Sequence, residues 1–288
     1  MKKEIILFDG PNGIPLWNKA EKKGYEKVPV WRYSMEHPEI VAELNKEYID
    51  AGADIILANT FTANRLAVAQ ASHYTTPEVV KASLGITKKA AKEKAAEGKH
   101  VKVGMAVGPL TMMMEPFGPV KESAVRDIYE EMIGAGADNG AEFYYVQTFM
   151  DLRMLKIVSE IAVRTGVPVL SSMTFQKSGR TLFGNTPEEI VREMEPVGIT
   201  AIGLNCELGP DQMLPILKEY AAVTDMPLVI KANAGVPKEQ GGTGIGCDPV
   251  SYADAAEKFF GYATYIGGCC GCDPDFIAEV HRRLRKTG

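Results

Sequence analysis

Residues 37–59 read HPEIVAELNKEYIDAGADIILAN, which predicts one helix followed directly by one strand. The first part has a proline in its first turn, is amphipathic, and ends at Gly52, as a surface helix does. The run ADIILAN is short, apolar and rich in isoleucine, which is typical of a strand buried on both faces. Such strands form parallel sheets that are covered by helices, so this stretch predicts an α/β architecture.

The same pattern of strand and helix repeats along the chain. Eight short apolar runs alternate with amphipathic segments of roughly 12–20 residues. A helix start is clearest after the fifth run, where Thr186 can act as N-cap, Pro187 takes the first helical position, and Glu189 lies three residues after the cap. Eight such units predict a (β/α)8 TIM barrel of the α/β class, as a single domain over residues 1–288. The predicted strands are residues 4–8, 53–59, 101–107, 142–148, 168–175, 201–206, 227–233 and 264–269.

An open, doubly wound sheet is the alternative fold. It would need a glycine-rich phosphate-binding turn after the first strand. Residues 8–17, FDGPNGIPLW, contain neither the G-x-G-x-x-G pattern nor the lysine of a P-loop, so the closed barrel is preferred.

The composition is that of an ordinary soluble globular protein, with 45% hydrophobic and 24% charged residues. The formal net charge of −5 argues against a nucleic-acid partner, because contacts with phosphates require a basic face. No run approaches the roughly 20 apolar residues of a membrane span, and the apolar run near the N-terminus is too short for a signal peptide. We therefore expect a cytoplasmic protein with neither nucleic acid nor membrane as its partner.

The cysteines indicate where the chemistry lies. In a TIM barrel, functional residues follow the C-terminal ends of the strands. Cys206 ends the sixth predicted strand, and Cys269 and Cys270 end the eighth, so three of the five cysteines fall on two strand ends. An odd cysteine count without an export signal disfavours a disulfide framework and favours metal binding or catalysis. Cys247 and Cys272 are interpreted as bystanders.

Neighbouring residues of a regular strand point to opposite faces, so two adjacent metal ligands need an irregular backbone. We expect Gly267, Gly268 and Gly271 to let the chain leave strand geometry, so that Cys269 and Cys270 face the same way. The alternative interpretation is that these cysteines are merely small buried apolar residues.

Three thiolates favour zinc over magnesium or manganese, because soft sulfur ligands select soft metals. Copper(I) and iron–sulfur chemistry remain alternatives, although only three convergent cysteines disfavour a four-thiolate cluster. A zinc ion with three thiolates activates water poorly but suits holding a further thiol as thiolate, which is the nucleophilic form. It could instead take the oxygen or sulfur of a methylated substrate and improve the leaving group. The site therefore predicts alkyl transfer to or from sulfur.

Five motifs, in order along the chain, carry a family resemblance. They are FDGPNG, NTF, GLNC, NAGVP and GGCCG, and they extend from Asp9 to Gly271. With them the chain resembles the homocysteine S-methyltransferase family. The resemblance implies a (β/α)8 barrel and a methyltransferase activity, with Cys206, Cys269 and Cys270 as the catalytic zinc ligands.

The resemblance also implies substrate contacts. Asp9 would hold the amino group of homocysteine, and backbone groups near Gly10 would hold its carboxylate. The family's usual Glu-Thr pair is Gln147-Thr148 here, and the usual PNAG is KANAG at 231–235. An amide in place of a carboxylate removes one negative partner for an ammonium. The substrate-binding residues implied at the mouth are Asp9, Gly10, Asn59, Gln147, Thr148 and Asn233.

Two functional hypotheses follow, and both use Zn²⁺ and a small-molecule methyl acceptor or donor. In the first, the enzyme transfers a methyl group to the zinc-bound thiolate of homocysteine and forms methionine. In the second, it is the substrate:corrinoid-protein methyltransferase of a demethylation system, with a methylated ether, amine or thioether as donor, and Gln147 favours this version. The D-x-H-x-x-G pattern is absent, so we expect no cobalamin-binding module here, and any corrinoid would come on a separate protein. A non-catalytic zinc-storage protein is a third possibility, which an open fourth coordination position disfavours.

Overall fold

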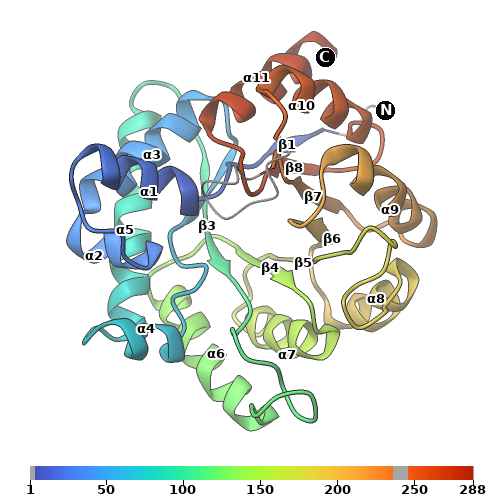
Figure 1. Cartoon of the computed structure of the whole chain (residues 1–288), viewed down its shortest axis with the longest axis horizontal. Helices are drawn as coiled ribbons and strands as arrows, with labels where there is room; N and C mark the ends of the chain where they lie inside the picture. Colours follow the sequence, from blue (N-terminus) through green and yellow to red (C-terminus); the bar gives the residue numbers. More distant parts are fainter. Residues whose placement is uncertain (1–3, 236–245, 288) are drawn as a thin grey trace.

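The computed structural model describes residues 4–235 and 246–287, and it confirms the predicted barrel. Parallel strands form one 8-stranded sheet in the order β1-β8-β7-β6-β5-β4-β3-β2, surrounded by helices (Figure 1). Each predicted apolar run overlaps one strand, and β4 extends one residue beyond its run. The strands are β1 (Ile6–Leu7), β2 (Ile55–Ala58), β3 (Lys102–Val107), β4 (Tyr144–Phe149), β5 (Val169–Met173), β6 (Ala201–Asn205), β7 (Leu228–Ala232) and β8 (Tyr265–Gly268).

The helices lie outside the sheet and alternate with the strands (Figure 1). The predicted start at Thr186 is confirmed: its side chain accepts from the backbone N–H of Glu189, and the Glu189 carboxylate accepts in return from the N–H of Thr186. The α-helices are α1 (Gly13–Lys22), α2 (Tyr33–Glu36), α3 (Pro38–Asp50), α4 (Arg65–Ala71), α5 (Thr76–Ala95), α6 (Glu122–Asp138), α7 (Leu152–Val163), α8 (Pro187–Met194), α9 (Pro210–Val223), α10 (Pro249–Ala256) and α11 (Pro274–Thr287). Short 3-10 turns are η1 (Val30–Arg32), η2 (Glu195–Val197) and η4 (Glu257–Phe259).

The strands separate two hydrophobic cores, because successive side chains of a strand point to opposite faces. In β2, Ile55 and Leu57 belong to the core inside the barrel, whereas Ile56 and Ala58 belong to the core between sheet and helices. Aromatic residues such as Phe8 and Tyr145 fill the interior, so the barrel centre is packed.

The seam between β1 and β2 closes the sheet, which excludes the open-sheet alternative. A bridge pairs Phe8 with Ile55, and the Asp54 N–H donates to the carbonyl of Leu7 at 2.8 Å. Because β1 is short, two carboxylates complete the seam. Asp54 accepts from the Leu7 N–H at 2.7 Å, and Asp9 accepts from the Leu57 N–H at 2.7 Å. Among the helices of the described residues, none is long and apolar enough to cross a membrane.

The glycines of the eighth unit differ from the expectation. Gly267 and Gly268 lie within β8 and pair with β7, so they do not bend the chain. They permit close packing instead: a Cβ at Gly267 would lie 2.5 Å from the Cβ of Phe8, and one at Gly268 would lie 2.9 Å from the sulfur of Cys272. Only Gly271 has a positive φ, of +86°, and it turns the chain after the two cysteines.

We predict that Gly271→Ala destabilises the metal-free protein by about 2 kcal/mol or more, because a Cβ meets the Gly235 carbonyl and the left-handed φ is costly for alanine. Urea unfolding in the presence of a chelator measures this change. Gly261→Ala is the matched control, since that position is open and its φ is not positive, and it should change stability by less than about 0.5 kcal/mol. Equal stabilities of the two variants would contradict the assignment.

Candidate metal centre

Three cysteines meet at the C-terminal mouth of the barrel. Cys206 directly follows β6, and Cys269 and Cys270 directly follow β8, while β7 lies between these two strands as predicted. The three sulfur atoms all lie within 4.8 Å of one another, and those of Cys206 and Cys270 are 3.6 Å apart. Within residues 4–235 and 246–287, this is the one group of three or more histidine, cysteine or acidic side chains that could hold a metal ion.

The donor set fits zinc. Zinc–sulfur bonds of about 2.3 Å in tetrahedral geometry place two sulfur ligands about 3.8 Å apart. The observed separation of 3.6 Å between the sulfurs of Cys206 and Cys270 is close to that value. No fourth protein ligand joins the group in the described part of the chain. Three protein ligands with one open position are typical of catalytic zinc sites rather than structural ones.

The backbone at Cys206 is left-handed, with φ of 65°, and that of Glu207 is similar, with φ of 62°. This conformation costs a non-glycine residue about 1–2 kcal/mol, so its surroundings must hold it. The N–H of Cys206 donates to the carbonyl of Lys231 at 3.0 Å, and its carbonyl accepts from the N–H of Leu208 at 2.7 Å. The turn directs the Cys206 sulfur toward the end of β8.

In the metal-free protein the three thiols stay protonated near neutral pH. The hydrogen bond with Cys206 and burial raise the pKa of Cys270 to about 12. For Cys269, contact with Cys206 lowers the pKa, but contact with Cys270 and burial outweigh it, and the pKa is about 12. The pKa of Cys206 is also raised, chiefly by its contact with Cys269. Adjacent thiolates repel one another, so a cation is needed to deprotonate the group.

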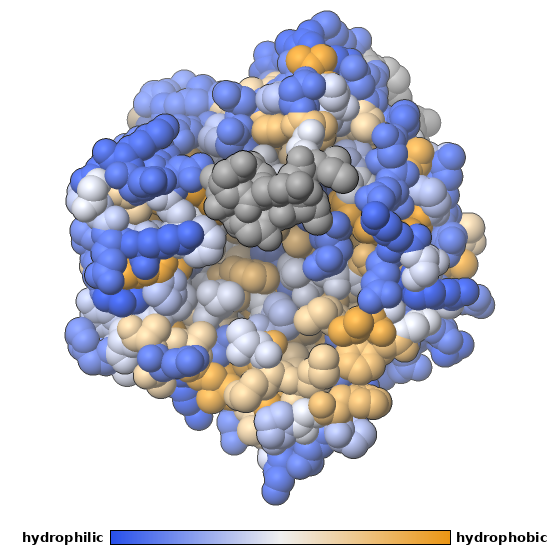
Figure 2. Space-filling view, in the orientation of Figure 1, coloured by the Kyte–Doolittle hydropathy of each residue, from blue (hydrophilic) through white to orange (hydrophobic). Residues whose placement is uncertain are grey.

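A cavity of about 490 Å³ opens above the cysteines and contains all three of them in its lining. Figure 2 views the barrel end on and shows a hollow near the centre, with hydrophobic residues gathered along its lower rim. Of the residues expected at the substrate, Gly10, Asn59, Gln147 and Thr148 line this cavity. Asp9 and Asn233 are not among its described lining residues.

The polar lining residues differ in what they offer. The Asn59 amide donates to the carbonyl of Val30 at 2.8 Å and to the hydroxyl of Ser34 at 3.1 Å, so it fixes the segment after α1. The Gln147 amide, in contrast, forms no hydrogen bond with another described residue, although the residue is buried, with only 8 % of its surface exposed. It is therefore available to a ligand in the cavity.

Sequence reasoning missed Asn205, which precedes the first cysteine in the motif GLNC. Its side-chain oxygen accepts from the Thr148 N–H at 2.8 Å and from the Ser172 hydroxyl at 2.6 Å. Its amide donates to the Thr148 hydroxyl at 2.7 Å and lies 3.8 Å from the sulfur of Cys269. Asn205 thus ties the end of β4, where Thr148 has φ of 67°, to the metal site.

Sequence reasoning also missed the partner of Asp9. The ammonium of Lys231, in β7, lies 3.0 Å from Asp9 Oδ1, and both side chains are almost fully buried, at 3 % and 2 % exposure. Lys231 lines the cavity, and Asp9 lies behind it. The only sequence signal was KANAG at 231–235 in place of PNAG, but the contact itself joins residues far apart in the chain.

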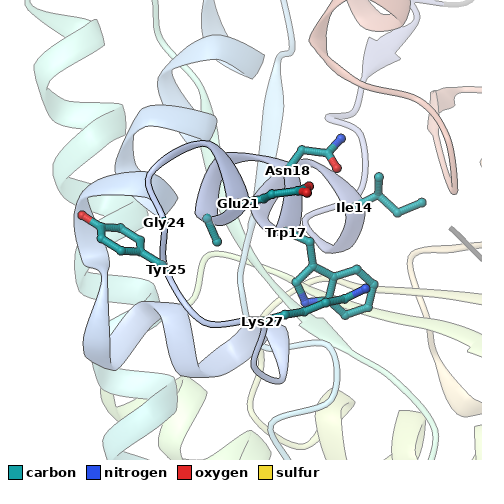
Figure 3. Close-up of a pocket in the computed structure, with 8 residues that line it drawn as sticks. Ile14, Trp17, Asn18, Glu21, Gly24, Tyr25 and Lys27 are labelled. Carbon is teal, nitrogen blue, oxygen red and sulfur yellow. The ribbon is translucent and has the colours of Figure 1, made fainter. Parts of the chain in front are cut away.

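The two remaining cysteines do not join the group. The buried thiol of Cys272 lies 3.6 Å from the carbonyl of Ala232, and the thiol of Cys247 lies 3.6 Å from that of Ala234. A second pocket of about 480 Å³ lies against α1 and contains no cysteine (Figure 3). It shares Ile14 and Trp17 with the cysteine cavity, and the ammonium of Lys27 lies 4.5 Å from the centre of the Trp17 indole.

Comparisons with known proteins agree with this geometry. The family model described as Homocysteine S-methyltransferase matches residues 6–284. Methionine synthase from Mycobacterium tuberculosis is 28% identical over 262 residues, which cover 84% of this chain but only 21% of that protein. The chain therefore spans about a fifth of the length of this curated relative.

Solved structures show the same fold. The metallated form of the homocysteine methyltransferase MmuM from Escherichia coli has a TM-score of 0.82 at 21% identity and covers 98% of this chain and 97% of its own. The carboxyl transferase domain of Rhizobium etli pyruvate carboxylase is more distant, with a TM-score of 0.52 at 11% identity, covering 98% of this chain and 47% of its own. The chain is an enzyme of the homocysteine S-methyltransferase family.

Proposed function

We propose that this chain is a zinc-dependent methyltransferase that transfers a methyl group to the sulfur of a thiol. The observation that carries the proposal is the convergence of Cys206, Cys269 and Cys270 on the floor of a 490 Å³ cavity. Zinc, when bound by these cysteines, would supply a soft Lewis acid with an open position that keeps a thiol in its nucleophilic thiolate form. The existence of a metallated form of the Escherichia coli relative supports a metal in this chain as well.

The residues of the chain would do the remaining work by holding and orienting the substrate. Trp31 and Phe61 form part of an apolar wall that excludes water from the reacting sulfur. The free amide of Gln147 can hold a polar group of the substrate. Asn205 keeps Thr148 and Cys269 in fixed positions, because it contacts both. Proximity of a fixed nucleophile to the methyl donor is the main rate effect that such a site can supply.

Homocysteine is the acceptor that the family name and the name of the Escherichia coli relative indicate, and methionine would be its product. In the tests, homocysteine is offered beside thiols that lack its ammonium group. Candidate donors are compounds with an activated methyl group, namely a sulfonium, a quaternary ammonium and methylcob(III)alamin. A methylated thiol found by mass spectrometry with any of these donors would support the proposal.

The second candidate is the corrinoid-dependent demethylation, and a surface feature favours it. Five apolar residues that follow β3, β4 and β5 are between 40 % and 63 % exposed, and we call them the apolar rim: Met112, Met113, Phe117, Met150 and Leu182. An exposed apolar patch beside an active-site mouth suits a protein that delivers or collects the methyl group. Figure 2 shows hydrophobic residues along this side of the hollow.

An assay with free cob(I)alamin distinguishes the two candidate functions. If the second function holds, zinc-loaded protein with an aryl methyl ether, trimethylamine or dimethyl sulfide converts cob(I)alamin into methylcobalamin, which absorbance follows. If the first holds, these compounds give no methylcobalamin, whereas thiols are methylated by the activated donors. The Cys269→Ala protein is the blank in both assays.

Loss of one sulfur should remove the metal and the activity together. We predict that Cys269→Ala lowers zinc from about one ion per chain to near zero and reduces methyl transfer at least about hundredfold, because the ligand set is then incomplete. Metal analysis and circular dichroism check metal content and fold. Cys247→Ala is the matched control, since that thiol lies outside the group and should leave both properties unchanged. Stoichiometric zinc in the Cys269→Ala protein would contradict the ligand assignment.

Zinc binding should strengthen as the pH rises. Cys269 and Cys270 have pKa values of about 12 without metal, and that of Cys206 is also raised, so the thiols must lose protons when the ion binds. We expect release of up to about three protons per zinc near neutral pH. Calorimetry in buffers with different ionisation enthalpies counts them. Release of less than one proton, or affinity that falls with rising pH, would show that the cysteines do not bind as thiolates.

A further inference from the structure

The strongest feature outside the metal group is the ion pair of Lys231 and Asp9. Its charged atoms are 3.0 Å apart in the barrel interior. The second oxygen of Asp9 accepts from the N–H of Leu57 at 2.7 Å, so both carboxylate oxygens are occupied. The ammonium of Lys231 also lies 4.8 Å from the ring centre of Phe8 and 5.8 Å from that of Tyr145. The pair is neutral overall and is enclosed by aromatic rings.

The barrel holds Lys231 in one place. Lys231 pairs in register with Gly267 of β8, and a Cβ at that glycine would lie 3.2 Å from the Cε of the lysine. The glycine therefore leaves room for the lysine stem. A lysine with 3 % exposure, a carboxylate partner and flanking aromatic rings does not leave its position without exposing two buried charges.

The charges around the cavity have a simple distribution. Among the described residues that line it, no aspartate or glutamate is present, and Lys231 is the only cation. Asp9 contacts the lining residue Lys231, and that lysine already neutralises its carboxylate. Among the described lining residues, a substrate ammonium would thus find a fixed ammonium and no free carboxylate, which is unfavourable for both charges.

The remaining wall suits an apolar body. One side of the cavity is provided by α1, η1, β2 and the segment after β2, and it is lined by Trp17, Trp31, Leu57 and Phe61. The indole N–H of Trp17 donates to the carbonyl of Val28 at 2.9 Å, so the ring offers its carbon atoms to a ligand. Figure 3 shows Trp17 and Ile14 projecting from α1, and both residues also line the cysteine cavity.

We infer that this site selects a thiol without an ammonium group and with a largely apolar body, and that Lys231 is the residue that determines this selectivity. The inference rests on the proposed function, because it concerns the thiol that the metal centre would hold. Lys231 acts by neutralising the carboxylate that a substrate ammonium would otherwise need. Homocysteine, which carries an ammonium, would be a poor ligand for this chain.

Binding of four thiols of similar length to the zinc-loaded protein tests the inference. The set is homocysteine, 4-mercaptobutanoate, 3-mercaptopropylamine and propane-1-thiol, which vary the ammonium and the carboxylate independently. Calorimetry should give a Kd that is at least about tenfold lower for each thiol without ammonium than for its ammonium-bearing counterpart. Equal affinities, or tighter binding of homocysteine, would overturn the inference and leave the proposed function intact. Failure of every thiol to bind would overturn the proposed function, and the inference with it.

Substitution of Lys231 provides an independent readout. In Lys231→Met the Asp9 carboxylate loses its partner, so discrimination against the ammonium should fall at least about tenfold or reverse. The double variant Asp9→Asn/Lys231→Met removes both charges and guards against misfolding of the single variant. It should lose the discrimination without reversing it. Lys88→Met is the matched control, because that lysine binds the carbonyl of Asn139 outside the cavity and should leave all four affinities unchanged. Unchanged discrimination in folded Lys231→Met protein would show that the lysine does not set selectivity.

Discussion

The carboxylate of Asp9 is the point at which the closing seam of the barrel and the cavity depend on each other. One oxygen accepts from the N–H of Leu57 in β2, and the other pairs with Lys231 in β7. The backbone of Asp9 adds a bond from its N–H to Ile55 and one from the N–H of Gly268 in β8. Burial raises the pKa of this carboxyl, while Lys231 and the Leu57 amide favour its charged form. The Asp9 side chain therefore joins β2 and β7 at the mouth only while Lys231 neutralises its negative charge.

That constraint reaches the metal group through the backbone. The carbonyl of Lys231 accepts from the N–H of Cys206, which keeps the left-handed turn after β6 in place. The N–H of Cys269 donates at 2.8 Å to Ala232, the residue that follows Lys231 in the chain. The end of β7 thus positions the cysteines that follow both of its neighbouring strands, β6 and β8. A change at β7 can alter the substrate pocket and the geometry of the sulfurs at once.

Local signals in the sequence were sufficient for much of this structure. Each strand is a short apolar run, the cap at Thr186 has its hydrogen-bonding partner three residues later, and the cysteines fall at strand ends. Contacts across the barrel were not predictable in this way. The role of Gly267 depends on which side chains approach it from β1 and β7, and the sequence pattern therefore indicated a bend where the structure has close packing. The left-handed backbone of Cys206 likewise depends on partners distant in sequence.

The same reasoning explains how one fold can serve different substrates. A barrel mouth can reject a charged group in two ways: by steric exclusion, or by leaving the group without a counter-charge. The second way needs only one residue in the right place. Burying an ammonium without a partner costs more free energy than losing an apolar contact. Lys231 is such a residue, since it neutralises Asp9 and leaves the shape of the cavity and its cysteines intact. The metal group would then set the reaction, while the residue at the end of β7 would set which thiol reaches it.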